Sequence, residues 1–279
     1  MDVLMKVKNV KHLLRKKTSH KFYVVFEKIM QNFLRVLFKT RCHAGISIMD
    51  EKWDYLIILD ACRYDYFKSV NTIKGALEKR ISKGCATREW LHKNFKSFYN
   101  DVIYVSANPF ISHIQFKQHL YPDFVGTEHF SNIIPCWNLH WDNKLGTVTP
   151  DKVTFAALKA IKKYPHKRFI IHYIQPHRPF LEKTTSGWKV TVRWYRDLLL
   201  PLPKLKKLRA AYKNNLKIAL HHVKKLVSKL DGKIVISADH GNLLGEYFLV
   251  GHFHEVYLKQ LVEIPWFTIN KRKKLRAKK

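Results

Sequence analysis

The sequence predicts an α/β fold with a mainly parallel central sheet that is covered by helices on both faces. Two observations carry this prediction: short apolar runs recur along the chain, and the stretches between them have the length and patterning of helices. Strands that alternate with helices form βαβ units, whose parallel strands are buried on both faces. With 279 residues, 46% of them hydrophobic, the chain is long enough to bury a substantial core.

The individual elements follow from local patterns. Each predicted strand is a short apolar run, and the first of them ends in an acidic residue, as expected where a buried strand enters a loop. Thr149 and Pro150 suit the N-cap and the first turn of one helix. The predicted strands are residues 53–60 (WDYLIILD), 102–107 (VIYVSA), 168–174 (RFIIHYI), 233–238 (KIVISA) and 264–269 (IPWFTI), and the predicted helices are residues 87–95, 151–163 and 205–230.

Three segments are expected along the chain: a basic amphipathic segment (residues 1–47), one globular domain (residues 48–270) and a basic tail (residues 271–279). A basic amphipathic helix either lies on an anionic membrane surface or packs on the domain that follows it, and the pattern leaves both alternatives open. The apolar positions with helical spacing in the first segment are Phe22, Phe26, Ile29, Phe33 and Val36 or Leu37.

The net charge of the chain indicates which classes of partner it attracts. The chain has 52 Lys and Arg against 21 Asp and Glu, a formal net charge of +31. This surplus attracts polyanions, namely nucleic acid, anionic lipid or acidic substrates, unless it is only a solvated basic surface.

The sequence shows no sign of export. The four cysteines lack metal-site spacing and do not indicate a disulfide framework. The first apolar stretch, residues 22–38, is interrupted by charged residues, and we recognise no cleavage site and no spanning helix. We therefore expect a cytoplasmic protein, with peripheral contact at the inner membrane surface as an option.

A metal site is predicted at the carboxyl ends of the strands, where reactive groups collect in parallel sheets. Asp239 and His240 follow one strand and offer an oxygen and a nitrogen ligand, and Gly241 gives the backbone room to turn. Asp60 adds a carboxylate from another strand, which permits one divalent cation with an open coordination position. The alternative for each residue is a helix-capping acid or a satisfied core histidine.

Thr87 is the candidate nucleophile because the chain enters a helix there, and a hydroxyl at a helix start faces free amides and the positive end of the helix dipole. A nearby metal ion would acidify it further. Cys85 is the rival nucleophile. The purely structural alternative is that Thr87 only caps the helix.

Two histidines and two arginines complete the candidate site. His177, between Pro176 and Arg178, and His252 can bind an ester oxygen, ligate a second metal or protonate a leaving group. Arg63 and Arg88 can clamp an anionic group bidentately, unless they pair with local carboxylates.

The order of these motifs resembles sulfatase-like members of the alkaline phosphatase superfamily over about residues 53–269. The motifs are LDACRYD, GCATREW, YIQPHRPF, SADHG, and GH followed by EVYLKQLVEIPW. The resemblance implies that residues 48–270 are a catalytic domain. It further implies that Asp60, Asp239 and His240 ligate the metal with Thr87 bridging metal and substrate, that His177 and His252 bind substrate or a second metal, and that Lys83 and Arg63 are supporting cations.

Departures from the family pattern narrow the chemistry. Cys85 is followed by Ala-Thr-Arg-Glu, which does not match the formylglycine motif, and Ala61 replaces a second early acid. Gln175 is a poor stand-in for the extra acid of two-zinc members. The missing second acid weakens a calcium-type site, and a one-metal site of Mn, Zn or Mg type, as in the phosphoglycerol and phosphoethanolamine transferases, fits what remains. The identity of the divalent ion, Mn, Zn, Mg or Ca, stays open.

The sequence therefore predicts an enzyme that hydrolyses or transfers a phosphate ester through Thr87, on an anionic substrate that is lipid- or glycan-linked. Two alternatives stay open. One is a sulfate ester hydrolase, and the other is a basic protein that binds membranes or nucleic acid and whose hydrolase site has decayed.

Overall fold

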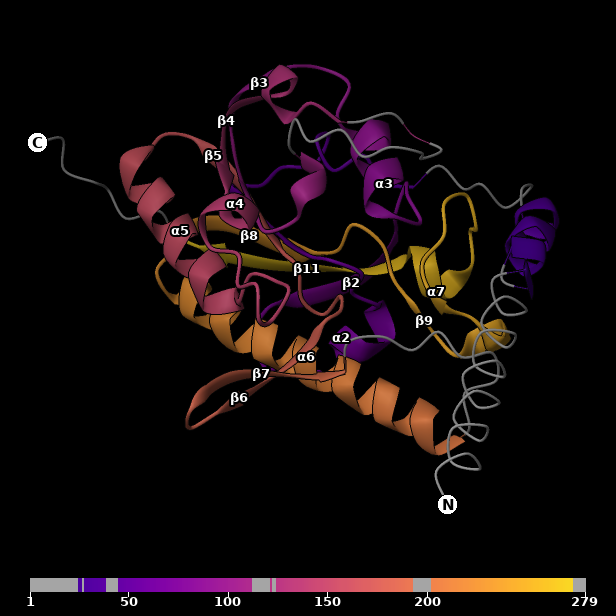
Figure 1. The fold of residues 1–279 in the computed structure, drawn as a ribbon. Coiled ribbons are helices and arrows are strands. Elements are labelled where there is room, and N and C mark those ends of the chain that lie inside the picture. Colours follow the sequence, from indigo (N-terminus) through magenta and orange to yellow (C-terminus); the bar gives the residue numbers. More distant parts are fainter. Residues whose placement is uncertain are drawn as a thin grey trace, which may run out of the picture.

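The computed structural model describes residues 25–26, 28–38, 45–111, 121, 124–192 and 202–272. A seven-stranded sheet crosses the middle of this structure in the order β2-β11-β8-β1-β5-β3-β4 (Figure 1). Its strands are β1 (Tyr55–Leu59), β2 (Ala76–Ile81), β3 (Tyr99–Ser106), β4 (Phe130–Pro135), β5 (Arg168–Tyr173), β8 (Gly232–Ser237) and β11 (Glu263–Lys271).

Helices cover both faces of the sheet, which confirms the predicted α/β fold. Helices α2, α5 and α6 lie on one face and α3 lies on the other (Figure 1). The helices are α2 (Tyr64–Val70), α3 (Thr87–Asn94), α4 (Cys136–Leu139), α5 (Pro150–Lys163), α6 (Leu202–Ser228) and α7 (Lys259–Val262), with short turns η2 (Pro109–Ile111), η3 (Gly126–Glu128) and η4 (Glu246–Phe248). Outside the main sheet lie the pairs β6 (Phe180–Thr184) with β7 (Gly187–Val192) and β9 (Leu243–Leu244) with β10 (Val250–Gly251).

The sheet separates two apolar cores, one on each face. Successive side chains along a strand point to opposite faces and so enter different cores. In β1, Ile57 and Leu59 point into the core under α5 and α6, whereas Leu56 and Ile58 point into the core under α3. All five residues of β1 are buried, as expected for a central strand with helices on both sides. The carboxyl end of β1 therefore opens at the same edge as those of its parallel neighbours β5 and β8.

One predicted strand has a different direction from the rest. Strand β11 is antiparallel to both β8 and β2, whereas β8, β1, β5, β3 and β4 are parallel. The physical reason is the place where the preceding segment ends. Only the four-residue α7 immediately precedes β11, and α7 lies at the carboxyl edge of the sheet, where the Gly241 amide donates to the Leu261 carbonyl oxygen. Strand β11 therefore starts at the edge where β8 ends, and the two strands run antiparallel.

Other differences are local. Strands β2, β4 and the β6–β7 pair and helix α2 were not predicted, because they are partly exposed and carry no strongly apolar run. Helix α5 begins at Pro150 after Thr149, as predicted, although the Thr149 side chain makes no capping hydrogen bond.

Residues 25–26 and 28–38, here called the N-terminal helix, pack on the domain along one side. Leu34 is 2% exposed and lies in an apolar cluster with Cys85, Leu249 and Val256. The Arg35 Nε donates to the His254 carbonyl oxygen over 3.0 Å. The predictions for residues 1–24 and 273–279 lie outside the described residues. No helix in the described part of the chain has the length and apolarity needed to span a membrane.

Candidate active site and metal centre

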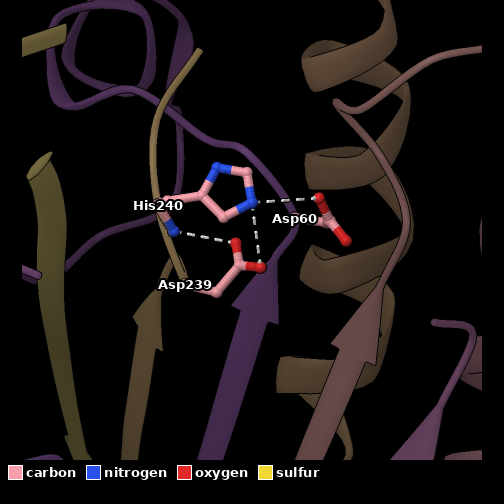
Figure 2. Close-up of side chains that lie close together, drawn as sticks. All are labelled: Asp60, Asp239 and His240. Atoms are coloured by element: carbon pink, nitrogen blue, oxygen red, sulfur yellow. Dashed lines mark hydrogen bonds and ion pairs between the residues drawn. The ribbon is translucent and has the colours of Figure 1, made fainter. Parts of the chain in front are cut away.

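Asp60, Asp239 and His240 meet at the carboxyl edge of the sheet. Asp60 follows β1, and Asp239 and His240 follow β8 after one intervening alanine. One ligand atom of each residue lies within 4.8 Å of the others, and all three side chains are buried (Figure 2). The structure thus brings together the three residues that the sequence marked as metal ligands.

Backbone amides bind only one of the two carboxylate oxygens of Asp239. Its Oδ1 accepts hydrogen bonds from the amides of Ala61 at 3.0 Å and His240 at 2.9 Å. Its Oδ2 faces the cluster and accepts the hydroxyl of Thr87 at 2.7 Å. This arrangement orients the carboxylate and leaves one oxygen for a cation.

The ring of His240 is oriented in the same way. Its Nδ1 lies 2.7 Å from the Gly241 carbonyl oxygen, an acceptor, so Nδ1 carries the hydrogen. Nε2 then faces the carboxylates, 3.3 Å from Asp239 Oδ2 and 3.9 Å from Asp60 Oδ1 (Figure 2). Glycine is required at residue 241 because a Cβ there would lie 2.0 Å from the Gln260 carbonyl oxygen.

Asp60 supplies the observation that a cation fits. Its Oδ1 is buried and has no hydrogen-bond partner among the described residues, while its Oδ2 accepts the Asn108 side-chain amide at 2.6 Å. Burial disfavours the charged form, but His172, His177 and His240 outweigh it and lower the pKa of Asp60 to about 2. Two buried carboxylates and an imidazole lone pair around one point form an oxygen and nitrogen donor set that suits a divalent metal ion.

Thr87 is the first residue of α3 and is 3% exposed. Its Oγ1 lies 3.3 Å from His240 Nε2 in addition to its hydrogen bond with Asp239. The N-cap position belongs to Ala86, so Thr87 is not the capping residue. The rival Cys85 lies in the apolar cluster beneath the N-terminal helix, with its side chain fully buried. The structure therefore separates the two candidate nucleophiles.

The rings of His177, His252 and His240 lie close together. The ring centroids of His240 and His252 are 4.2 Å apart, and those of His252 and His177 are 5.2 Å apart. The His177 amide donates to the Asp60 carbonyl oxygen, and the Asn215 side chain of α6 donates to the His177 carbonyl oxygen. Burial lowers the pKa of both His177 and His252 and outweighs the Asp60 carboxylate, which acts to raise the pKa of His177, while the Arg178 guanidinium lowers both further. Both rings are therefore neutral near pH 7.

The three candidate cations lie in different surroundings. The guanidinium of Arg63 forms ion pairs with Asp65 and Glu246 at 2.7 Å each, which favours the alternative of pairing with local carboxylates. Arg88 is 3% exposed, donates to the Tyr121 carbonyl oxygen and lies over the ring of Phe110. Lys83 is half-buried in the loop before α3. None of these contacts assigns a substrate role.

Sequence reasoning missed two residues at the cluster. The Asn108 side-chain amide contacts Asp60 and lies 3.4 Å from Thr87 Oγ1. His172 of β5 is 1% exposed, and its Nε2 lies 3.6 Å from Asp60 Oδ2 and 3.9 Å from Asp239 Oδ2. The position of Asn108 just past β3 was a usable signal. The signal for His172 was a single polar residue within an apolar strand.

A buried carboxylate fixes the start of α3. Glu89 is fully buried, and its oxygens accept the amides of Cys85 and Glu255 and the ammonium of Lys93. Burial opposes its ionisation, but Lys93, the Glu255 amide and Tyr257 stabilise the carboxylate more, so the pKa of Glu89 lies below its ordinary value of 4.5. This network joins α3 to the loop that carries His252.

Replacing Glu89 by Gln should lower the free energy of unfolding by about 2 kcal/mol at neutral pH, since a buried charged acceptor is lost. A lowered pKa contributes stability that is present above pH 4.5 and is lost as the pH falls through the folded-state pKa. The difference between wild type and variant should therefore shrink in acid, as measured by urea unfolding across pH. Glu182→Gln, whose carboxylate is 45% exposed beside Lys189, is the control and should stay within about 0.5 kcal/mol. A pH-independent difference would contradict the assignment.

Comparison with known proteins identifies solved structures that share the fold of this chain. No protein-family model and no curated protein sequence matches the chain. Solved structures do match. The soluble domain of lipooligosaccharide phosphoethanolamine transferase A from Neisseria meningitidis is 14% identical with a TM-score of 0.52, over 77% of this chain and 75% of that chain.

Two further structures share the fold. The C-terminal periplasmic domain of EcEptC from Escherichia coli, in complex with Zn, is 10% identical with a TM-score of 0.52, over 82% of this chain and 76% of that chain. The phosphonate monoester hydrolase of Agrobacterium radiobacter is 13% identical with a TM-score of 0.51, over 78% of this chain and 68% of that chain. The chain has the fold of the alkaline phosphatase and sulfatase superfamily, as the motifs indicated.

The comparison corrects the expected location. We expected a cytoplasmic protein with contact at the inner membrane surface, but the matching Escherichia coli structure is a periplasmic domain and the Neisseria meningitidis structure is the soluble domain of a transferase. The cytoplasmic expectation is wrong. The expectation rested on finding no export signal and no membrane-spanning helix in the sequence. A periplasmic domain of this fold need not contain such a helix.

Proposed function

We propose that this chain is a metal-dependent enzyme that transfers or hydrolyses a phosphate ester with Thr87 as its nucleophile. The observation that carries the proposal is the position of the hydroxyl. Thr87 Oγ1 lies 2.7 Å from Asp239 Oδ2 and 3.3 Å from His240 Nε2, so a nucleophile shares one point with a buried donor set. A threonine that only capped the helix would not need these contacts with Asp239 and His240.

Asp60, Asp239 and His240 would hold a divalent cation such as Mn, Zn, Mg or Ca, with Thr87 Oγ1 beside it. When bound, the cation would acidify the Thr87 hydroxyl and offset negative charge on the phosphoryl group. The protein fixes the orientation of this set in advance, because backbone groups hold Asp239 Oδ1 and His240 Nδ1. The solved neighbour in complex with Zn supports a metal of this type.

The reaction proceeds in two displacements. Thr87 Oγ1 loses its proton to solvent water and attacks phosphorus, the ester P–O bond breaks, and phosphothreonine forms. The departing oxygen takes a proton from water, guided by the neutral His177 or His252 beside the cluster. Water or an acceptor alcohol then attacks the same phosphorus and loses a proton to solvent, the P–Oγ1 bond breaks, and Thr87 Oγ1 takes a proton back from solvent. The Asn108 amide is placed to hydrogen-bond a phosphoryl oxygen.

The substrate we propose is an anionic phosphoester that is linked to a lipid or glycan. One matching structure belongs to a lipooligosaccharide phosphoethanolamine transferase, and the net charge of +31 would attract an anionic substrate.

Side-by-side turnover of nitrophenyl phosphate, bis-nitrophenyl phosphate and nitrophenyl sulfate, each with added Mn, Zn, Mg or Ca, tests the proposal. We expect metal-dependent release of nitrophenol from a phosphate ester and little from the sulfate. Preferential sulfate hydrolysis would make the chain a sulfatase. No turnover of any ester, together with no bound metal by elemental analysis, would make it a binding protein with a decayed site.

A further inference from the structure

The N-terminal helix has an apolar side that nothing in the described structure covers. Met30, Leu34 and Phe38 face the domain. Around the helix from them lies a second set of large apolar side chains, here called the exposed stripe: Val25 (55% exposed), Ile29 (61%), Phe33 (56%), Val36 (78%) and Leu37 (53%).

The exposed stripe is a continuous surface. Residues 25, 29 and 33 are four apart and 33, 36 and 37 continue the spacing, so their side chains are neighbours along one side of the helix. The stripe also stands out in the molecule as a whole. It contains five of the eleven large apolar side chains that are exposed among the described residues. Such a concentration is typical of a surface that binds a partner.

The charges beside the stripe identify the kind of partner. Lys28 and Arg35 lie on the same helix, and the preceding residues 1–24 contain seven Lys and Arg and a single Asp. Apolar burial combined with many cations matches the interface of an anionic lipid bilayer, where both contributions add. A second copy of a chain with a net charge of +31 would be repelled, and nucleic acid offers no apolar surface of this kind.

The stripe is tied to the edge of the candidate site. The N-terminal helix shares an apolar cluster with Leu261 and Val262 of α7, and its Arg35 donates to the carbonyl oxygen of His254, two residues after His252 (Figure 1). Its buried side packs on Cys85, two residues before Thr87. A bilayer that bound the exposed stripe would therefore lie close to the groups proposed for catalysis.

We propose that the exposed stripe binds the surface of an anionic bilayer and places the site next to lipid-linked phosphoesters. The benefit of membrane binding, access to lipid-linked phosphoesters, rests on the proposed function. The binding itself does not require catalysis. The stripe enters the boundary between headgroups and acyl chains, and the surrounding Lys and Arg contact acidic headgroups.

Vesicle cosedimentation of the full chain tests the inference. Binding to mixed phosphatidylglycerol and phosphatidylcholine vesicles should exceed binding to pure phosphatidylcholine vesicles and fall at high salt. The double variant Ile29→Glu/Phe33→Glu should reduce binding to the mixed vesicles by at least about tenfold. The matched control Leu139→Glu/Phe155→Glu changes two side chains that are 60% and 61% exposed elsewhere, and should bind like wild type.

The outcomes separate this inference from the proposed function. Turnover of soluble nitrophenyl phosphate should be the same in the stripe variant and in wild type, so an inactive wild type would defeat the proposed function without touching the binding result. Equal vesicle binding by wild type and the stripe variant would overturn the inference, as would a wild-type dimer that the variant dissociates in sedimentation velocity. Val36→Asp, at the most exposed position, provides the same test if the double variant does not fold.

Discussion

Replacing Thr87 by Ala should reduce turnover by more than about a thousandfold and leave the fold intact, because removal of a nucleophile cannot be compensated by the groups around it. The lost hydroxyl makes one short hydrogen bond, to Asp239, and two long contacts, with His240 Nε2 and the Asn108 amide, so the expected cost in unfolding free energy is only about 1 kcal/mol. Steady-state turnover of nitrophenyl phosphate and thermal unfolding measure the two effects. Mass spectrometry of acid-quenched wild type should in addition detect one phosphoryl group on Thr87.

Two variants serve as controls for this prediction. Thr87→Ser keeps a hydroxyl and should keep substantial activity. Cys85→Ala removes the rival nucleophile, whose side chain is enclosed with Leu249 and Val256, and should remain active. If Thr87→Ala turns over at the wild-type rate while Cys85→Ala is dead, the roles of the two residues are reversed.

Replacing Asp239 by Asn should lower metal affinity by more than about a hundredfold, since even groups behind a metal ligand contribute 10–100-fold and this carboxylate would bind directly. Turnover should fall with it. The shape of the side chain is preserved, and the amides of Ala61 and His240 can still donate to its oxygen. Elemental analysis of protein purified without chelator measures the bound metal.

Thermal unfolding gives a readout that does not depend on activity. Metal at about 100 times its dissociation constant should stabilise wild type by about 2.7 kcal/mol and should leave Asp239→Asn unchanged. Asp101→Asn is the control, because its carboxylate is 48% exposed beside Arg168 in the first half of β3. A full metal complement in Asp239→Asn would show that the cluster is not the metal site.

Comparison of Thr87→Ala with Asp239→Asn separates loss of the nucleophile from loss of the metal site. Thr87→Ala should keep its metal and lose turnover, whereas Asp239→Asn should lose both. The distinction is physical, because Asp239 contributes a buried charge to the donor set and Thr87 contributes only a hydroxyl beside it. The same loss of metal in both variants would instead mean that Thr87 is needed mainly to bind the ion.

The fold class was accessible from local patterns because each strand and helix signals itself within a short window. The runs at β1, β5 and β8 lie within one or two residues of their predicted bounds. The direction of β11 was not accessible, since apolar composition does not encode direction. The missed strand β2 is half-exposed on the sheet edge and has no strong apolar run.

The candidate site divides in a similar way. The adjacency of Asp239 and His240 at a strand end and the helix-start position of Thr87 were visible in the sequence. The involvement of His172 was hidden, because a histidine inside a strand has no local sign of what it faces. Ion pairs of Arg63 with Asp65 and Glu246 were equally hidden, and they change how its charge is interpreted.

By itself, the sequence determined the fold class, the segments that carry reactive groups and the chemical types of those groups. The tertiary structure alone decided that Thr87 faces Asp239, 152 residues away, while Cys85 lies in an apolar cluster. It also decided that one side of the N-terminal helix is packed and another exposed. The physical reason is that periodicity and strand ends are local properties of the chain, whereas contacts between distant residues depend on the order of strands in the sheet and on the faces that helices bury.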